Sequence, residues 1–170
     1  KPYVSLETPD VRDFALTDPR QFLSRYPKGA VLDEIQRAPH LFSYIQDIVD
    51  QNRKAGLFIL TGSQNFLLLE NLSQTLAGRV NILKLLPLSM EEMASASIPF
   101  KSPEELLFRG FYPRIYDKRI APREWYPAYI QTYLERDVRQ VKNIGDLNAF
   151  QRFLKFCAAQ TGQLLNLSSL

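Results

Sequence analysis

Apolar residues recur along the first third of the chain in two alternating patterns, one typical of strands and one typical of helices. Residues 3–6 and 30–32 are short apolar-rich runs that favour strands, and residues 57–60 form a third, continuous apolar run. Between the last two runs, apolar residues at helical spacing over 41–49 predict an amphipathic helix. Strand, helix and strand in this order predict a right-handed crossover within a parallel sheet.

Capping residues indicate where the early helices begin. Asp10, after a proline that stops the first strand, is expected to cap a helix over residues 11–16. Asp18 followed by Pro19 combines a good N-cap with a good first helical residue, so a second helix is expected from Pro19.

The middle of the chain predicts a further helix and a further strand. Helical spacing covers residues 66–76, and a mostly apolar run over 80–86 favours another strand. Ser89 stands three residues before Glu92, which predicts a capping box and a short helix directly after Ser89.

The character of the chain changes near residue 98. Residues 98–127 are rich in proline, aromatic residues and arginine, and two long helical patterns follow over 126–141 and 147–159 with no strand between them. We therefore predict two domains, an α/β domain over residues 1–97 and a mostly helical one over 98–170.

Composition limits the class of protein. With 170 residues and 45% apolar content, the chain can hold one ordinary domain, or an incomplete domain and part of a second. The net charge of +3 is too small to indicate nucleic-acid binding by itself. No apolar run approaches the roughly 20 residues that span a bilayer, and no signal peptide is evident, so a cytoplasmic location is expected. The lone Cys157 lies in an apolar stretch and is predicted to be a buried thiol. We also expect both ends of the chain to lie within a longer protein.

Two adjacent carboxylates, Asp33 and Glu34, directly follow the buried run over 30–32. The carboxyl ends of parallel strands face the crevice where ligands bind, and P-loop ATPases place a magnesium ligand beside a catalytic base there. A strand that ends in a solvated turn would carry the same residues, so this pair alone leaves both interpretations open. Nothing in residues 1–32 has the Gly-x-x-x-x-Gly-Lys-Ser/Thr form of a phosphate-binding loop.

Two further segments carry side chains suited to phosphate chemistry. The apolar run over 57–60 is followed by hydroxyl and amide side chains, of which Ser63 and Gln64 suit hydrogen bonding to a γ-phosphate or its attacking water. Arg79 follows Gly78, and a guanidinium group can stabilise the charge on a transferred phosphoryl group.

Four motifs in the same order and at similar spacing resemble a prokaryotic subgroup of AAA-type P-loop ATPases, within the AAA+ superfamily. They are Leu32-Asp33-Glu34-Ile35-Gln36-Arg37-Ala38-Pro39, Leu60-Thr61-Gly62-Ser63-Gln64, Leu76-Ala77-Gly78-Arg79 and Leu86-Pro87-Leu88-Ser89. Members of this subgroup carry a C-terminal domain of unknown function, and residues 110–113 and 133–138 resemble that part. The resemblance covers nearly the whole chain.

The resemblance implies a parallel-sheet P-loop NTPase core that lacks its first strand and Walker A loop, followed by a mostly helical C-terminal segment. It implies that Asp33 holds Mg²⁺ as part of the Walker B pair and that Glu34 activates the attacking water. Ser63 or Gln64 matches the sensor position, with Ser63 also contacting the nucleotide. Arg79 matches an arginine that acts within one subunit or between subunits. We therefore expect the intact protein to bind ATP and Mg²⁺ and hydrolyse ATP, and this chain alone to bind ATP weakly or not at all.

The missing first strand bears on the sheet and on oligomerisation. In AAA-type sheets that strand is central, so its absence is expected to leave two strand edges unpaired. Residues 57–61 are then expected either to pair with residues 80–85 or to recruit a second chain, which would give a homo-oligomer.

Two other features have competing interpretations. His40 is the only histidine, and with no cysteine partner it is expected to be structural rather than a metal ligand. Basic residues interleaved with aromatic ones suit a non-catalytic module that binds DNA or a protein partner, although a solvated helical face would show the same mixture. These residues are Arg114, Lys118, Arg119 and Arg123 with Tyr112, Tyr116 and Trp125.

Overall fold

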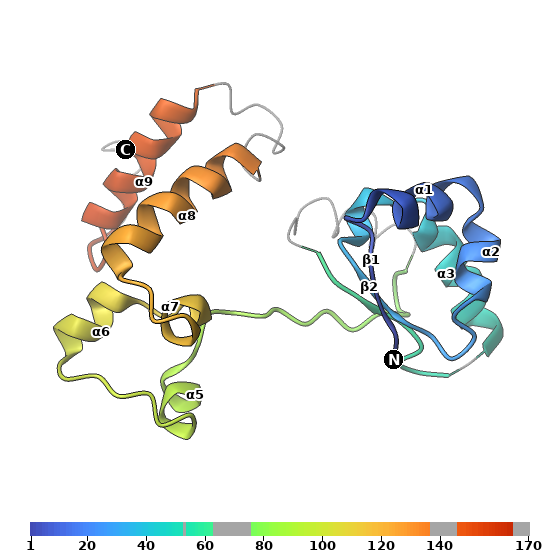
Figure 1. The fold of residues 1–170 in the computed structure, drawn as a ribbon, viewed down its shortest axis with the longest axis horizontal. Coiled ribbons are helices and arrows are strands. Elements are labelled where there is room, and N and C mark those ends of the chain that lie inside the picture. Colours follow the sequence, from blue (N-terminus) through green and yellow to red (C-terminus); the bar gives the residue numbers. More distant parts are fainter. Residues whose placement is uncertain (53, 63–75, 137–145, 165–170) are drawn as a thin grey trace. The chain divides into compact units, whose positions relative to one another are not determined.

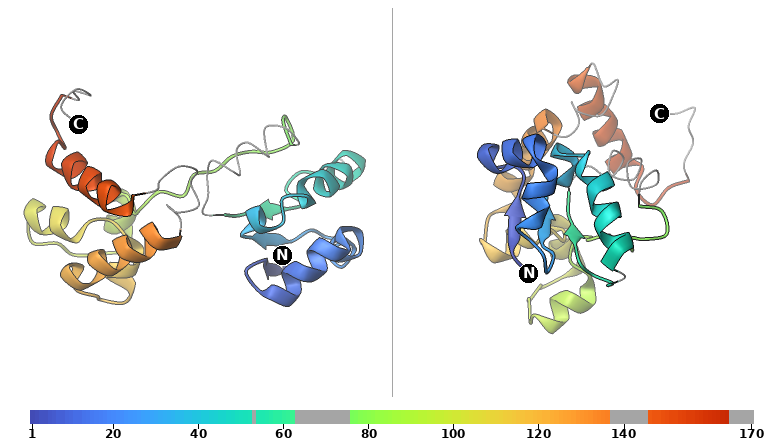
Figure 2. Two further views of the ribbon diagram at one scale, coloured as in Figure 1. Left: turned by 90° about the horizontal axis from the view of Figure 1, so that it is seen from above. Right: turned by 90° about the vertical axis from the view of Figure 1, so that its right-hand side faces the viewer.

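The computed structural model describes residues 1–52, 54–62, 76–136 and 146–164. Contacts between residues divide the chain into two compact units, Lys1–Leu83 and Lys84–Leu170. Each unit has its own helices and its own packing, and each is described by itself (Figures 1 and 2).

The N-terminal unit is a parallel sheet with helices alongside its strands (Figures 1 and 2). Its three strands lie in the order β1-β2-β3, so that β2 is central. The elements in chain order are β1 (Tyr3–Ser5), α1 (Pro9–Thr17), α2 (Pro19–Ser24), β2 (Val31–Asp33), a 3-10 helix η1 (Ile35–Arg37), α3 (Leu41–Asn52) and β3 (Ile59–Leu60). This confirms the predicted α/β architecture, including the crossover from β2 through α3 to β3.

One hydrophobic core joins the sheet to the helices. Leu32 of the central strand is fully buried between Val4 of β1 and Leu60 of β3, its partners in the parallel register. Phe22 of α2 and Phe42 of α3 are each 1% exposed and belong to the same buried cluster. Burial of large apolar side chains is the main favourable term in folding, so this cluster is what holds the strand ends in place.

The caps of the first two helices follow local chemistry, with one correction. The Asp18 side chain accepts a hydrogen bond from the Gln21 amide nitrogen at 3.0 Å, as its position before a proline predicts. The expected cap by Asp10 is wrong, because α1 already begins at Pro9 and Asp10 lies in its first turn. Proline suits the first helical position, since its φ is already helical and its missing N–H would have no partner there.

The predicted strand over residues 80–86 is not formed. These residues adopt neither helix nor strand, and the side chains of Leu83 and Leu85 are 85% and 101% exposed. A strand is stabilised by hydrogen bonds to a neighbouring strand, and within the described residues β3 pairs with β2 alone. The expected pairing of residues 57–61 with 80–85 is therefore wrong, while recruitment of a second chain stays a prediction. The predicted helix over 66–76 lies outside the described residues except for Leu76.

The described part of the C-terminal unit is helical, as predicted. Its helices are α5 (Met90–Ser95), α6 (Pro103–Arg109), α7 (Pro113–Asp117), α8 (Pro122–Arg136) and α9 (Leu147–Ala159). The capping box at α5 is confirmed, because the Ser89 hydroxyl accepts from the Glu92 amide at 3.1 Å and the Ser89 amide donates to the Glu92 carboxylate at 2.8 Å.

Two tyrosines fasten α6, α7 and α8 together. The Tyr126 hydroxyl of α8 donates to the Arg109 carbonyl at the end of α6, at 2.9 Å, and the Tyr116 hydroxyl of α7 donates to the Gly110 carbonyl at 2.5 Å. Ile115 of α7 is buried, at 1% exposure. The α6–α7 turn is thus fixed from both following helices.

The thiol of Cys157 is exposed, which corrects the predicted burial. Cys157 lies on α9, where Phe153 and Phe156 are also about half exposed. Apolar spacing indicates that a helix has an apolar face, but burial needs a partner surface, and none of the described residues covers these side chains. No described helix is both long and apolar enough to cross a membrane.

Candidate nucleotide site

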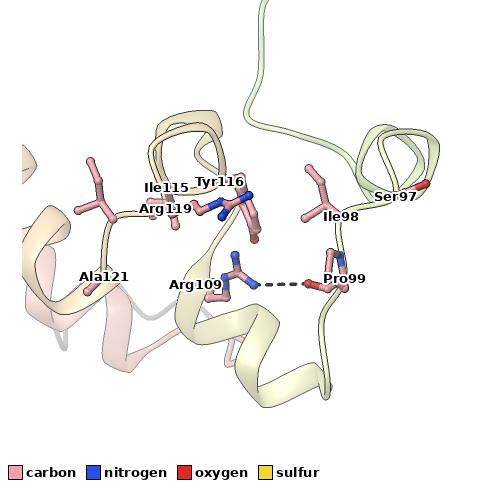
Figure 3. A pocket seen from close by; sticks show the side chains of 9 residues that line it. Ser97, Ile98, Pro99, Arg109, Ile115, Tyr116, Arg119 and Ala121 are labelled. Carbon is pink, nitrogen blue, oxygen red and sulfur yellow. Dashed lines mark hydrogen bonds between the residues drawn. The ribbon is translucent and has the colours of Figure 1, made fainter.

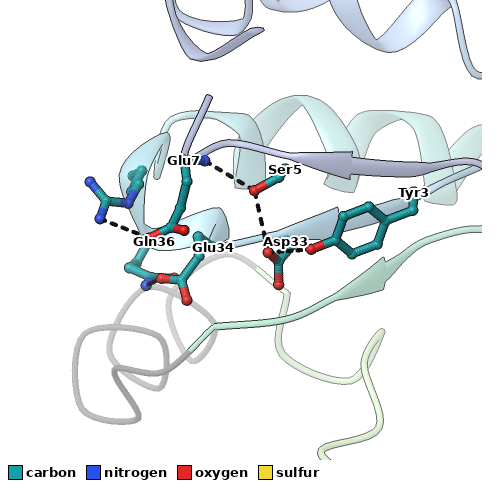
Figure 4. Close-up of polar contacts among 7 residues, drawn as sticks. Tyr3, Ser5, Glu7, Asp33, Glu34 and Gln36 are labelled. Carbon is teal, nitrogen blue, oxygen red and sulfur yellow. Dashed lines mark hydrogen bonds and ion pairs between the residues drawn. The ribbon is translucent and has the colours of Figure 1, made fainter. Parts of the chain in front are cut away.

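The carboxyl ends of the three strands bring Asp33 and Glu34 to one edge of the sheet (Figure 4). Asp33 is the last residue of the central strand β2 and lies opposite Ser5 of β1 in the parallel register. Thr61 directly follows β3. Asp33 is therefore flanked on both sides by the ends of neighbouring strands.

Hydroxyl groups from both neighbouring strands hold the Asp33 carboxylate. Tyr3 donates to Oδ2 at 2.6 Å and Ser5 donates to the same oxygen at 3.4 Å, both from β1 (Figure 4). Thr61 donates to Oδ1 at 2.5 Å from the other side. Tyr3 and Ser5 are not predicted from the sequence as part of the site, whereas Thr61 belongs to the predicted Leu60–Gln64 motif without an individual role. The available signal was that Tyr3 and Ser5 are two residues apart on one strand and so share a face.

These hydrogen bonds keep Asp33 ionised. The bond from Thr61, followed by that from Tyr3, holds the pKa of the Asp33 carboxyl below its usual value, and partial burial opposes this only in part. The same contact raises the pKa of the Tyr3 hydroxyl. Hydrogen bonds donated to a carboxylate favour its charged form, which is the form that binds a cation.

Replacing Thr61 by valine is expected to raise the pKa of Asp33, because the largest cause of its depression is removed. The stability contributed by a depressed carboxyl is present above its unfolded pKa, near 3.8, and is lost as pH falls through the lower folded value. Thr61→Val should lose part of this contribution. Carbon-13 NMR titration of the Asp33 carboxyl measures the shift directly. Thr8→Val is the matched control, because Thr8 makes no side-chain cap bond, and an equal pKa in Thr61→Val and wild type would contradict the assignment.

Glu34 lies at a sharp bend in the backbone. Its φ of 56° and ψ of 44° are left-handed, so the chain leaves the strand direction directly after Asp33 and enters η1. The side-chain Nε2 of Gln36 donates to the Glu34 carboxylate (Figure 4). Adjacent strand residues point to opposite faces, and this bend frees Glu34 from that constraint. The Gln36 Oε1 atom is buried and has no hydrogen-bond partner among the described residues.

The side chains around Asp33 suit Mg²⁺ in type. Mg²⁺ prefers oxygen ligands and is usually held by one or two carboxylates together with waters and substrate phosphates. Asp33 supplies an ionised carboxylate surrounded by hydroxyl oxygens, and its longest contact, to Ser5 at 3.4 Å, is the most readily exchanged. The described residues contain no cluster of three or more His, Cys, Asp or Glu side chains, so a complete protein cage is absent among them.

Arg79 is paired with a different carboxylate. Its Nε and Nη2 donate to the two carboxylate oxygens of Asp50 at 2.6 and 3.0 Å. The Arg79 hydrogen bond lowers the pKa of Asp50, and the Asp50 bond raises that of Arg79. Asp50 lies near the end of α3, which runs back from the carboxyl edge of the sheet. The structure therefore does not bring Arg79 to Asp33 and Glu34.

The sequence also predicts two sensor candidates and a structural histidine. Ser63 and Gln64 lie outside the described residues, so their sensor role stays a prediction. His40 Nε2 lies 3.1 Å from the Ala15 carbonyl oxygen, a structural contact of the kind expected.

The aromatic residues of the C-terminal unit pack on one another. Trp125 and Tyr129, one turn apart on α8, are stacked at 4.7 Å between ring centroids, and Tyr112 lies 5.0 and 5.1 Å from the same two rings. Their faces thus contribute to internal packing. A DNA- or protein-binding surface in this half of the chain stays a prediction.

Comparison with known families agrees with this geometry. Residues 1–94 match the AAA domain family, and residues 100–170 match a domain of unknown function, DUF8612. The first match covers more than half of the chain, so the chain belongs to the AAA domain family. The resemblance inferred from the four motifs is confirmed, the sheet is part of a P-loop core, and the family implies nucleotide binding.

Two mycobacterial proteins are similar to the chain. They are the uncharacterised proteins Rv2008c of Mycobacterium tuberculosis and Mb2031c of Mycobacterium bovis, each 32% identical over 128 residues. The match covers 74% of this chain but 28% of each relative. No solved structure matches the chain significantly. The family matches leave residues 95–99 between them and contacts divide the chain at 83/84, so the domain boundary at 97/98 stays a prediction.

Proposed function

We propose that the N-terminal unit forms part of an ATP-hydrolysing site in a longer protein. One observation supports this most strongly: Asp33, at the carboxyl end of the central strand, is held ionised by hydroxyls from both neighbouring strands, and Glu34 follows it on a left-handed bend. This arrangement supplies an ionised carboxylate and a second carboxylate free of the strand's alternation, as a metal ligand beside a general base requires.

Asp33 would hold Mg²⁺, directly or through a water. When bound, the ion would neutralise charge on the β- and γ-phosphates of ATP. The lowered pKa of Asp33 extends the pH range over which its carboxyl is ionised, and thus able to bind a cation, toward lower pH. Tyr3 and Thr61 keep the carboxylate oriented from opposite sides.

Glu34 would orient the water that attacks the γ-phosphate and accept its proton. The hydrogen bond from the side-chain Nε2 of Gln36 restrains one carboxylate oxygen of Glu34. Such a restraint lowers the entropy lost when the base is positioned on its substrate.

Ser63 or Gln64 would contact the γ-phosphate, and Arg79 would stabilise negative charge in the transition state, within one subunit or between two. Arg79 must first leave Asp50. The Arg79 and Asp50 side chains are 38% and 45% exposed. Because exposed ion pairs contribute little to stability, breaking this pair costs little free energy.

The phosphate-binding loop of the proposed site lies outside this chain. No stretch of the 170 residues has the Gly-x-x-x-x-Gly-Lys-Ser/Thr form, and the chain spans 28% of the length of its curated relatives. ATP hydrolysis is accordingly a property of the intact protein, and residues 1–170 alone would bind ATP weakly or not at all.

The dependence of ATP hydrolysis on Mg²⁺ tests the role of Asp33. In the intact protein, Asp33→Asn should raise the Mg²⁺ concentration for half-maximal activity at least about tenfold, because a charged ligand is lost. Asp47→Asn removes the same charge from an exposed position on α3 and should leave that concentration unchanged. An unchanged Mg²⁺ dependence in Asp33→Asn contradicts its assignment. Absence of any hydrolysis by the wild-type protein contradicts the whole proposal and favours the non-catalytic binding module.

A further inference from the structure

A cavity of about 570 Å³, widely open to solvent, lies at the surface of the C-terminal unit between α7 and the segment that follows α5. Its volume is within the range of small-molecule sites. Three of its lining residues are isoleucines: Ile98 on the segment after α5, Ile115 on α7 and Ile120 between α7 and α8. The nine described residues that line the cavity include Arg109 and Arg119 and no carboxylate (Figure 3). The lining therefore combines apolar side chains with excess positive charge.

Arg109 is held in a fixed position at this cavity. Its guanidinium lies over the Tyr116 ring, 4.6 Å from the centroid, and donates to the Pro99 carbonyl at 3.4 Å (Figure 3). The Glu105 carboxylate, one turn earlier on α6, lies 3.6 Å from Nη1 of Arg109 and balances part of the guanidinium charge. Glu105 also accepts a hydrogen bond from the Lys101 amide at 2.6 Å. A guanidinium restrained in this way is pre-organised to receive an oxyanion.

Arg119 has no comparable partner. Among the described residues it makes no ion pair and no hydrogen bond, yet it lines the same cavity (Figure 3). Its φ of 51° is left-handed, and so is the φ of 52° at Ser97, another lining residue. Each residue directly follows a helix C-cap, Ala96 of α5 and Lys118 of α7, where helices commonly end on a left-handed residue, although this conformation is strained for arginine and serine. Arg119 is exposed, so a solvent-accessible guanidinium group lies at the cavity with no described ion-pair partner.

The geometry points to a binding site for a small organic oxyanion, a phosphate monoester or a carboxylate carried on an apolar body. The oxyanion would lie between Arg109 and Arg119, because two guanidinium groups match its charge and its paired acceptor oxygens. The apolar body would lie against Ile98, Ile115 and Ile120. Six of the nine lining residues lie in the part of the chain that matches a domain of unknown function, and residues 97–99 directly precede it. The residues of the proposed ATP site belong to the N-terminal unit.

Four probes separate the contributions of charge and apolar contact. Hexyl phosphate, hexanoate, hexanol and inorganic phosphate are titrated into the full chain, and binding is followed by NMR at the methyl groups of Ile115 and Ile120. Hexyl phosphate or hexanoate should give saturable shifts, and the tighter of the two identifies the phosphate or the carboxylate as the natural group. Hexanol and inorganic phosphate should each bind at least about tenfold more weakly, since each lacks one half of the recognised chemistry.

Variants then locate the site. Arg119→Gln should weaken binding of the better anion at least about tenfold. Arg114→Gln removes the same charge from an exposed position on α7 outside the cavity. This variant should change the dissociation constant of the better anion less than about twofold. Arg119→Gly should lose binding while the melting temperature stays the same or rises, because glycine is unstrained at this φ. A purely structural role for Arg119 predicts the opposite stability change.

Three results would overturn the proposal. The first is binding of hexanol as tight as that of the anions, which would make the cavity a simple apolar site. The second is an equal loss in Arg114→Gln and Arg119→Gln, which would indicate general surface charge. The third is the absence of saturable shifts with both hexyl phosphate and hexanoate.

Discussion

In the intact protein, replacing Glu34 by glutamine is expected to lower the turnover number for ATP roughly 10²- to 10⁴-fold, the usual contribution of a general base. Glutamine keeps the shape of glutamate but cannot accept the proton of the attacking water. The Michaelis constant for ATP should change much less, because Asp33 and the phosphate-binding loop are untouched. The expected loss is thus in chemistry and not in binding.

Steady-state kinetics with a matched control variant measure this effect. Glu7→Gln removes the same charge from a nearby side chain whose ion pair, to Arg37 at 3.2 Å, is exposed. Its turnover should stay within about threefold of wild type, as expected for an exposed pair. If Glu34→Gln keeps turnover near the wild-type value, or raises only the Michaelis constant, Glu34 is not the base.

Gly29→Ala is expected to destabilise the chain by about 3 kcal/mol or more. Gly29 has a φ of 78°, and a Cβ atom at this position would lie 1.6 Å from the Leu57 carbonyl oxygen. The position of the Cβ atom is set by the backbone, and the Leu57 carbonyl oxygen is a backbone atom. The backbone before β2 and the backbone before β3 would therefore have to separate. Asp33 and Thr61 lie at the far ends of these strands, and their hydrogen bond depends on the same pairing.

Gly56→Ala is the control for the backbone conformation alone. Gly56 has a similar φ of 69°, but nothing lies within 4 Å of its Cβ position. Gly56→Ala should lower the free energy of unfolding by about 1 kcal/mol, the strain of a left-handed alanine. Urea unfolding of both variants measures the difference, and equal destabilisation would show that the approach to Leu57 does not constrain the fold.

Local sequence signals were sufficient for most of the elements. Asp18 and Ser89 each cap a helix through bonds to residues three positions away, so a short window of sequence identifies them. The crossover from β2 to β3 follows from two apolar runs and one amphipathic helix, because each pattern has its own period.

Long-range contacts could not be predicted from local sequence signals. The hydroxyl contacts of Tyr3 and Thr61 to Asp33 depend on strand register, which an apolar run alone does not specify. The strand expected over residues 80–86 has suitable residues but no described partner, and β propensity alone does not make a strand. The ion pair of Arg79 with Asp50 joins residues 29 positions apart and has no local signal.

The candidate site likewise has one part that local sequence predicts and one part that it does not. The pair Asp33–Glu34 is predictable because it directly follows a buried strand, and its motif belongs to the family resemblance that the AAA domain match confirms. The left-handed bend at Glu34, which makes two roles possible for adjacent residues, has no signature in the residue types, since non-glycine residues rarely adopt it.

The most direct test of the central claim compares ATP hydrolysis by the intact protein with hydrolysis by residues 1–170 alone, at equal concentration and with saturating Mg²⁺. We expect Mg²⁺-dependent release of phosphate by the intact protein and none above background by residues 1–170. Turnover by residues 1–170 at the rate of the intact protein would contradict the claim that this chain holds only part of the site, and its absence in both would contradict the ATPase assignment itself.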